Sequence, residues 1–235
     1  YQANKAALTM AESDGYALMD NGNYTPVTGA FATLYNNEGV ANKEALFVKA
    51  YDYSVSITHG WENSVRPYVA GSGTGGQGAN PTWDLVKAFP MKNGLNIREA
   101  GSGWDSTYYW KNRDPRFYAT IGYNGCTWAM TGMTGTKIWS YEKSNTETAN
   151  GTTTGFYCRK MTNPAIASST SNTVGTDWIE IRLAEVILNL AECANETNRQ
   201  IEAIDLIGKI RKRAGILVGD GYYGLKPSYT DKVDL

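Results

Sequence analysis

The feature that most constrains this chain is a run of apolar residues at helical spacing in its C-terminal third. The run is made by Ile179, Leu183, Val186, Ile187, Leu190 and Ala194, and after a polar break at 195–198 by Ile201, Ile204, Ile207 and Ile210. Spacings of three and four residues place side chains along one face of a helix. Two amphipathic helices joined by so short a break are expected to pack as an antiparallel hairpin.

Residues at both ends of this segment support that prediction. Asp177 lies just before the apolar run, and Glu180 lies three positions after Asp177. This is the pattern of a capped helix start. The second helix ends in a basic run, 209–213, followed by Gly215. Cations in a last turn complement the helix dipole, and glycine suits the left-handed residue that follows. The basic run is therefore interpreted as a helix end rather than a phosphate site.

The rest of the chain has weaker patterns. Residues 1–13 are expected to form another helix, ending near Asp14, and 45–51 a strand. Between about 51 and 178 the pattern is broken repeatedly by glycine, most densely at 71–78. We expect a mainly α fold with a large irregular lobe and few short strands.

Aromatic residues are concentrated in that lobe. Residues 51–130 hold five of the seven tryptophans and half of all the aromatic residues. They are scattered among Gly, Asn, Ser and Thr without a clean period. This is typical of a loop-rich unit with some rings at its surface.

Charge and composition exclude several classes of function. The net charge is −1, which argues against a nucleic-acid binder. No apolar stretch approaches the ~20 residues that span a bilayer. The three cysteines lack metal-site spacing, Cys193 falls on the apolar side of a helix where we expect it buried, and His59 is the only histidine. No catalytic or dinucleotide-binding motif appears. We expect no cofactor and no metal.

Four segments together resemble one known family, the SusD/RagB family of outer-membrane nutrient-binding lipoproteins. They are PTWDLVKAF at 81–89 with MKNG at 91–94, RDPRFYATI at 113–121 with YNG at 123–125 and Trp128, RLAEVILNLAE at 182–192, and IRKRAGI at 210–216. Each is similar to a motif of the family, and the four follow the family's order over nearly the whole chain. The match to the RDPRF segment is the closest.

The resemblance implies tetratricopeptide-like helical hairpins that carry an irregular lobe. It also implies a lipid-anchored protein on a Bacteroidetes outer membrane, seated on a SusC-type TonB-dependent transporter. The lipidated cysteine of the family is not in this sequence, so an internal fragment with its anchor elsewhere is expected. The expected regions are 1–50, the end of a helical scaffold; 51–176, the ligand-binding lobe; 177–216, the hairpin; and 217–235, the start of a C-terminal loop region.

A non-catalytic receptor would hold a sugar through aromatic rings against its C–H face and polar groups around its hydroxyl rim. Shallow platforms on loops also suit reversible release. The candidate ligand-binding residues are Trp61, Tyr68, Trp104, Asp105, Tyr108, Tyr109, Trp110 and Asn112. Arg113, Asp114 and Arg116 are expected to support the lobe rather than to catalyse, and Phe117 and Trp128 to lie in its core.

Three alternatives stay open at this point. The cargo is a glycan or, as in a RagB-like receptor, an oligopeptide; the wealth of aromatic residues favours a glycan. A glycoside hydrolase with two carboxylates is one rival. A helical scaffold that binds only proteins is the other, in which case the aromatic lobe would be a core or a docking surface.

Overall fold

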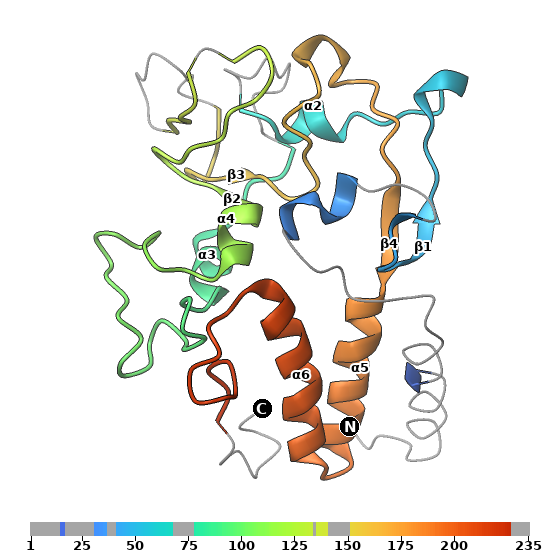
Figure 1. Ribbon diagram of the computed structural model, residues 1–235. Coiled ribbons are helices and arrows are strands. Elements are labelled where there is room, and N and C mark those ends of the chain that lie inside the picture. The colour runs from blue at the N-terminus through green and yellow to red at the C-terminus, as the bar shows by residue number, and fades with distance from the viewer. Residues whose placement is uncertain are drawn as a thin grey trace.

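The chain is described by a computed structural model that covers residues 15–16, 31–36, 41–67, 78–133, 135–140 and 151–226. Its two long helices lie at one end, and short helices, strands and loops make up the rest (Figure 1). Among the described helices, none combines the length and the apolar character that crossing a membrane requires. The helix expected over 1–13 and the candidate Tyr68 lie outside the described residues.

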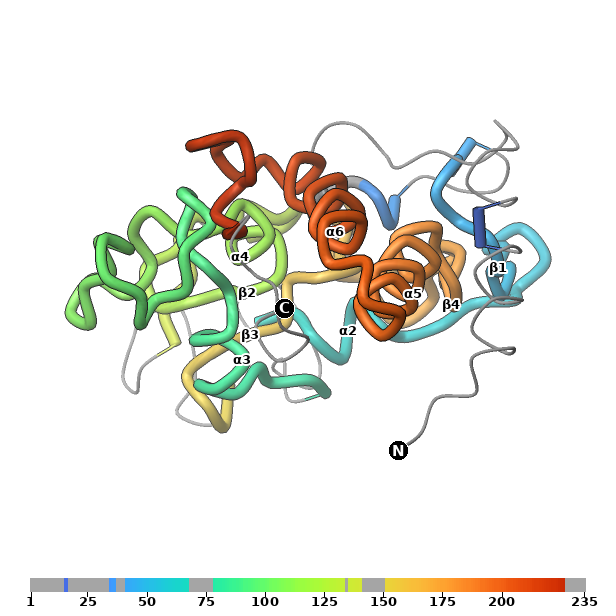
Figure 2. The backbone as a smooth tube through the Cα atoms, turned by 90° about the horizontal axis from the view of Figure 1, so that it is seen from below, coloured from blue at the N-terminus to red at the C-terminus, as the bar shows by residue number. Residues whose placement is uncertain are grey.

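The predicted hairpin is present. Helix α5 (Leu183–Glu196) and helix α6 (Gln200–Ala214) run side by side, as both Figure 1 and Figure 2 show. Their shared core is entirely apolar and contains Leu183, Ala184, Ile187, Leu190, Ala191, Leu206 and Ile210. Cys193 is buried on α5, as expected.

The end of the hairpin is also as predicted. Arg211, Lys212 and Arg213 occupy the last turn of α6, and Gly215 follows the helix at φ 83°, in the left-handed region. Its N–H donates to the carbonyls of Arg211 and Lys212. The basic run is therefore a helix terminus, whose cations lie at the negative end of the dipole.

The predicted start of the first helix is wrong. Residues Trp178–Arg182 form a strand, β4, which pairs antiparallel with β1 (Ala45–Lys49) and matches Val48 with Ile179. Asp177 caps no helix; its Oδ1 accepts a hydrogen bond from the Tyr51 N–H at 3.1 Å. The segment WIEIR alternates and is rich in β-branched and aromatic residues, so a strand partner distant in sequence prevails over the local capping pattern.

Glu44, immediately before β1, joins the strands to the hairpin. Its carboxylate is fully buried and is paired with Arg182 of β4 and Arg213 of α6. Its backbone carbonyl accepts the Leu183 N–H at 2.9 Å, which satisfies a free donor in the first turn of α5. Glu44 therefore links β1, which it precedes, to β4 and to α6.

The lobe is built from short elements with long connections. Its helices are α2 (Trp61–Val65), α3 (Trp83–Ala88) and α4 (Pro115–Thr120). Strands β2 (Ile121–Gly122) and β3 (Tyr157–Cys158) pair antiparallel, and 3-10 turns occur at Phe31–Asn36, Tyr53–Val55 and Ser168–Thr170. Phe117 and Trp128 lie in two apolar clusters of this lobe, so both are core residues, as predicted.

The predicted supporting role of the RDPR segment is confirmed. Asp114 caps α4 by accepting the Arg116 N–H at 2.8 Å, and the two side chains form an ion pair at 2.5 Å. Arg113 is buried and donates to three backbone carbonyls, those of Val86 at 2.7 Å, Phe89 at 2.6 Å and Tyr109 at 2.8 Å. Arg113 thus fastens α3 to the aromatic segment before α4.

Candidate functional site

Two of the predicted ligand-binding residues lie at the centre of a group of aromatic rings. Tyr109 meets Trp83 edge to face at a centroid distance of 5.2 Å, and it meets Phe156 at 6.0 Å. Trp110 contacts Tyr109 at 5.0 Å and stacks on Tyr123 at 5.9 Å with an interplanar angle of 18°. Burial raises the pKa of Tyr109 and of Tyr123 to about 12. These phenols therefore stay neutral at physiological pH.

Two rings at the margin of this group are open to solvent. Trp83, at the first position of α3, is 41 % exposed. Tyr108 is 44 % exposed, and its ring meets the Trp110 ring edge to face at a centroid distance of 5.8 Å. The Lys111 Nζ lies 3.7 Å from the centroid of Tyr108. We call the six residues Trp83, Tyr108, Tyr109, Trp110, Tyr123 and Phe156 the ring cluster.

The polar candidates on the same segment shape its backbone. The Asp105 Oδ1 accepts the Thr107 N–H at 2.7 Å and so closes a turn ahead of Tyr108. Asn112 is exposed with φ 53°, and its carbonyl accepts the Lys92 N–H at 2.7 Å. Trp104 is half-buried, and its buried Nε1 has no hydrogen-bond partner within the described part of the chain.

Trp61 lies in a separate place. It begins α2, its Nε1 donates to the Lys160 carbonyl at 3.3 Å, and its ring meets Trp178 at 5.4 Å. His59 joins this second group, 6.1 Å from Trp178 and 4.7 Å from Tyr51. The predicted aromatic residues therefore do not form one platform: Tyr108, Tyr109 and Trp110 belong to one group, Trp61 to another, and Trp104 to neither.

Sequence reasoning missed three members of the ring cluster. Tyr123 and Phe156 are distant in sequence from 104–112, and no local pattern links them. Trp83 had a usable signal. It follows Thr82, whose side chain caps α3 by accepting the Leu85 N–H at 3.2 Å, and an aromatic ring at the first turn of a short capped helix is placed near solvent.

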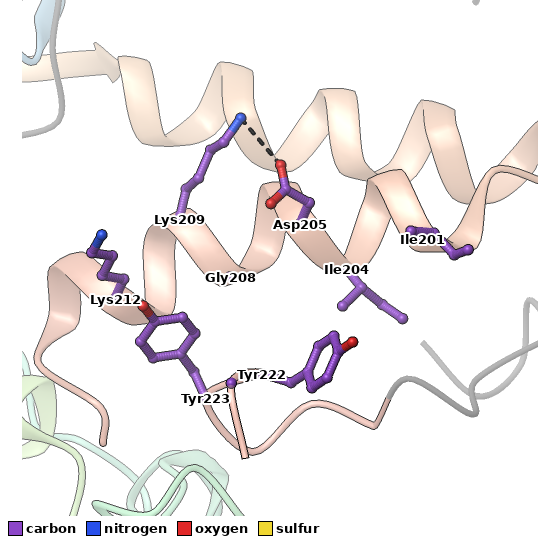
Figure 3. A pocket seen from close by; sticks show the side chains of 9 residues that line it. Ile201, Ile204, Asp205, Gly208, Lys209, Lys212, Tyr222 and Tyr223 are labelled. Atoms are coloured by element: carbon purple, nitrogen blue, oxygen red, sulfur yellow. Dashed lines mark ion pairs between the residues drawn. The ribbon is translucent and has the colours of Figure 1, made fainter. Parts of the chain in front are cut away.

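Two sizeable hollows are among those on the surface of the described part of the chain. One, of about 940 Å³, lies between residues 50–53, 163–166 and 170–177. The other, of about 590 Å³, lies beside α6 and contains none of the predicted residues (Figure 3). In Figure 3 the Tyr222 and Tyr223 side chains come from the segment after α6 and lie beside that helix, and Lys209 pairs with Asp205 at 3.4 Å.

Some of the groups with catalytic or metal-binding chemistry are engaged in structural contacts. Across residues 41–67, 78–133 and 151–226, His, Cys, Asp and Glu form no group of three that could hold a metal ion. The His59 Nδ1 accepts the Trp61 N–H at 3.3 Å, and its Nε2 lies 2.9 Å from the Thr176 carbonyl. The buried carboxylates of Glu44, Glu62 and Asp114 are each paired with arginine.

Comparison with known proteins places this arrangement in a family. Residues 43–220 match the model of the SusD family. No curated protein matches the chain. Among solved structures, it is similar to a SusD-like protein from Bacteroides fragilis, with a TM-score of 0.65 and 23 % identity over 89 % of this chain and 43 % of that one.

Two further solved structures share the fold. A SusD-like carbohydrate binding protein from Bacteroides fragilis matches with a TM-score of 0.62 and 23 % identity, over 89 % of this chain and 41 % of that one. Surface glycan-binding protein A from Bacteroides uniformis matches with a TM-score of 0.56 and 17 % identity, over 95 % and 45 %. The chain spans less than half the length of these structures. From its sequence match and its mainly helical fold with short strands, the chain belongs to the SusD family.

Proposed function

We propose that this chain captures glycans at a cell surface without altering them, and holds them on the exposed rings of the ring cluster. The glycan would then pass to a SusC-type TonB-dependent transporter in the outer membrane. A lipid anchor outside this sequence would attach the protein to that membrane. Membership of the SusD family and the two glycan-binding relatives support this role.

The observation that carries the proposal is the exposure of two braced rings. Trp83 and Tyr108 each leave more than two fifths of their surface open, yet each packs against a half-buried ring behind it. A ring held in place by its neighbours loses little conformational freedom when a sugar stacks on it. The C–H face of a pyranose fits an aromatic ring by apolar contact.

Polar groups suited to the rim of a sugar are close to these rings. The side chains of Asp84, Lys87 and Asp105 are on the exposed turns that carry Trp83 and Tyr108. We expect shallow contacts, because the exposed rings Trp83 and Tyr108 lie outside both hollows described above. Shallow contact favours the reversible binding that a delivery protein needs.

Three buried carboxylates are committed to arginine and are not available for catalysis. A glycosidase needs two carboxyl groups that both reach the glycosidic bond. Glu44, Glu62 and Asp114 are each less than 3 % exposed and are each bonded to arginine. The two relatives that are described by their ligands bind carbohydrate or glycan, which favours a glycan over a peptide.

Calorimetric titration with a panel of neutral hexasaccharides, followed by product analysis, tests the proposal. Trp83→Ala and Tyr108→Ala are each expected to weaken binding about tenfold, because each removes a stacking surface worth about 1.4 kcal/mol. Leu85→Ala is the matched control, since Leu85 is 45 % exposed on the same helix but is not aromatic.

The expected result is bound sugar that is recovered intact. Unchanged affinity in both aromatic variants would show that the rings do not hold the sugar. Cleaved product would show that the chain is an enzyme. Tighter binding of hexapeptides than of any sugar in the panel would contradict the choice of ligand class.

A further inference from the structure

The larger hollow, of about 940 Å³, is on the opposite side of the molecule from residues 104–112. Figures 1 and 2 both place residues 50–58 at one side and the green loop that holds 104–112 at the other. The residues that line the hollow and bear on its chemistry are Tyr51, Asp52, Tyr53, Asn163, Thr173 and Asp177.

Two walls of the hollow are fixed to each other by backbone contacts. The His59 N–H donates to the Val174 carbonyl and the Val174 N–H to the His59 carbonyl, both at 2.9 Å. Gly175 lies so close to Tyr53 that a Cβ added to it would be 2.5 Å from the Tyr53 nitrogen. Only glycine permits this approach, so the walls have a set separation.

The third wall is anchored by a buried ion pair. Glu62 and Arg66, on and after α2, are 2.7 Å apart and almost fully buried. The Asn163 N–H donates to Glu62 at 2.6 Å, while Arg66 donates to the carbonyls of Asn163 at 2.7 Å and Ile166 at 2.9 Å. Charged groups that satisfy loop carbonyls hold the turn in one shape. The hollow is therefore preorganised, which lowers the entropic cost of binding.

The lining indicates which ligand would fit. Tyr53 is 64 % exposed, so its ring offers a stacking surface, and Asn163, Thr170 and Thr173 offer amide and hydroxyl groups. Asp52 and Asp177 supply carboxylate acceptors, and the lining contains no lysine or arginine. Lys49 lies over the Tyr51 ring at 5.1 Å, outside the lining. An anionic ligand would meet two carboxylates without a compensating cation.

We infer that this hollow is a second binding site, for neutral, hydroxyl-rich saccharide units. The Tyr53 ring would take the C–H face of a sugar, and Asp52, Thr173 and Asp177 would take its hydroxyls. The ligand class rests on the proposed function, but the residues are different. Two sites on opposite sides would let one long glycan chain, or two chains, engage the same molecule.

Backbone amide shifts of the isotope-labelled chain separate the two sites. Neutral hexasaccharides such as maltohexaose, xylohexaose and cellohexaose are titrated while the amides of Tyr53, Gly175, Trp83 and Tyr108 are followed. At least one neutral sugar is expected to shift the Tyr53 and Gly175 amides. Hexagalacturonate, which is anionic, is expected to shift them less.

Variants then assign the shifts. Tyr53→Ala is expected to weaken the response at Gly175 about tenfold and to leave the response at Trp83 unchanged. Thr173→Val, which removes one hydroxyl and keeps the side-chain shape, should weaken the response at Gly175 by a smaller factor than Tyr53→Ala does. Val55→Ala, 61 % exposed on the same turn but outside the hollow, is the control.

The outcomes distinguish this inference from the proposed function. Shifts confined to Trp83 and Tyr108 would overturn the second site and leave the ring cluster as the binding site. Shifts confined to Tyr53 and Gly175 would support the hollow and contradict the role of the ring cluster. The absence of shifts at both places with every sugar at about 10 mM would overturn both, because even weak sites are occupied at that concentration.

Discussion

The hairpin and the lobe of this molecule are both packed, but by different means. The core between α5 and α6 is a cluster of apolar side chains arranged by helical periodicity, and a buried charge pair, Glu44 with Arg213, contacts the hairpin only in the last turn of α6. The lobe also buries charged side chains, Glu62, Arg66, Arg113 and Asp114, most of whose contacts are with backbone groups. A helix satisfies its own N–H and carbonyl groups, whereas an irregular loop needs partners for them.

This difference explains how loops can carry a binding surface. Arg113 donates to carbonyls in and just after the helix that begins with Trp83, and Arg66 fixes the turn beside the larger hollow. The lobe is therefore kept in shape by a few long polar side chains. We expect its stability to depend on those few anchors, and that of the hairpin to depend on its apolar stripe.

The largest expected effect is at Arg113. Arg113→Ala removes the donor to three carbonyls, one buried and two partly buried, and opens a cavity, so we expect a loss of about 4 kcal/mol in the free energy of unfolding. Urea denaturation followed by tryptophan fluorescence measures it. Arg98→Ala, at an exposed arginine of the same lobe, is the control. A loss of unfolding free energy for Arg113→Ala no larger than that for Arg98→Ala would show that the lobe does not depend on this polar anchor.

The next largest expected loss of stability is in the hairpin. Leu190→Ala removes a side chain that is 2 % exposed at the α5–α6 contact, and a loss of about 3 kcal/mol is expected from lost burial and the cavity. Leu188→Ala on the same helix is the matched control, because Leu188 is 46 % exposed. Equal losses at the two leucines would mean that the apolar stripe does not stabilise the hairpin.

A pH effect is expected in the ring cluster. Burial raises the pKa of Tyr109 and Tyr123 to about 12, above the ordinary value near 10. The folded state thus holds these protons more tightly than the unfolded state, and the stability from this source is present below pH 10 and is lost as the pH rises towards 12. Tyrosinate absorbance and unfolding at pH 9–12 measure it.

Tyr109→Phe and Tyr123→Phe serve as controls for this effect. Each is expected to reduce the loss of stability above pH 10, since phenylalanine has no proton to release. If both tyrosines titrate near pH 10 in the folded chain, the ring cluster is open to water. The lobe would then not be packed as the comparison with the hairpin requires.

The smallest effect is expected at the surface of the hairpin. Lys209 pairs with Asp205 at 3.4 Å on α6, and both side chains are largely exposed. Lys209→Ala should change the free energy of unfolding by no more than about 0.5 kcal/mol. Urea denaturation at low and high salt checks this. A loss comparable to that of Leu190→Ala would show that charge pairs matter in the hairpin as they do in the lobe.

The hairpin could be predicted because its pattern is local. Leucine and isoleucine at helical spacing define both helices, and Gly215 marks the end. The start was misplaced because Ile179 fits both a helical and an alternating pattern. Its strand partner, Val48, is far away in the sequence. Long-range pairing of this kind leaves no local signal.

The site could be predicted only in part, for a similar reason. Tyr108, Tyr109 and Trp110 are adjacent in sequence and do belong to one cluster. Trp61 was grouped with them by composition, yet its ring packs on Trp178. Phe156 contacts the cluster although it is far from residues 108–110 in the sequence. Which rings meet is decided by tertiary packing, which composition does not encode.

The most direct test of the account is a crystal structure of the chain with a bound neutral oligosaccharide. The account predicts an intact glycan with a sugar ring stacked on Trp83 or Tyr108. A glycan cleaved in the crystal, or one bound only at surfaces that exclude both of these rings, would contradict it.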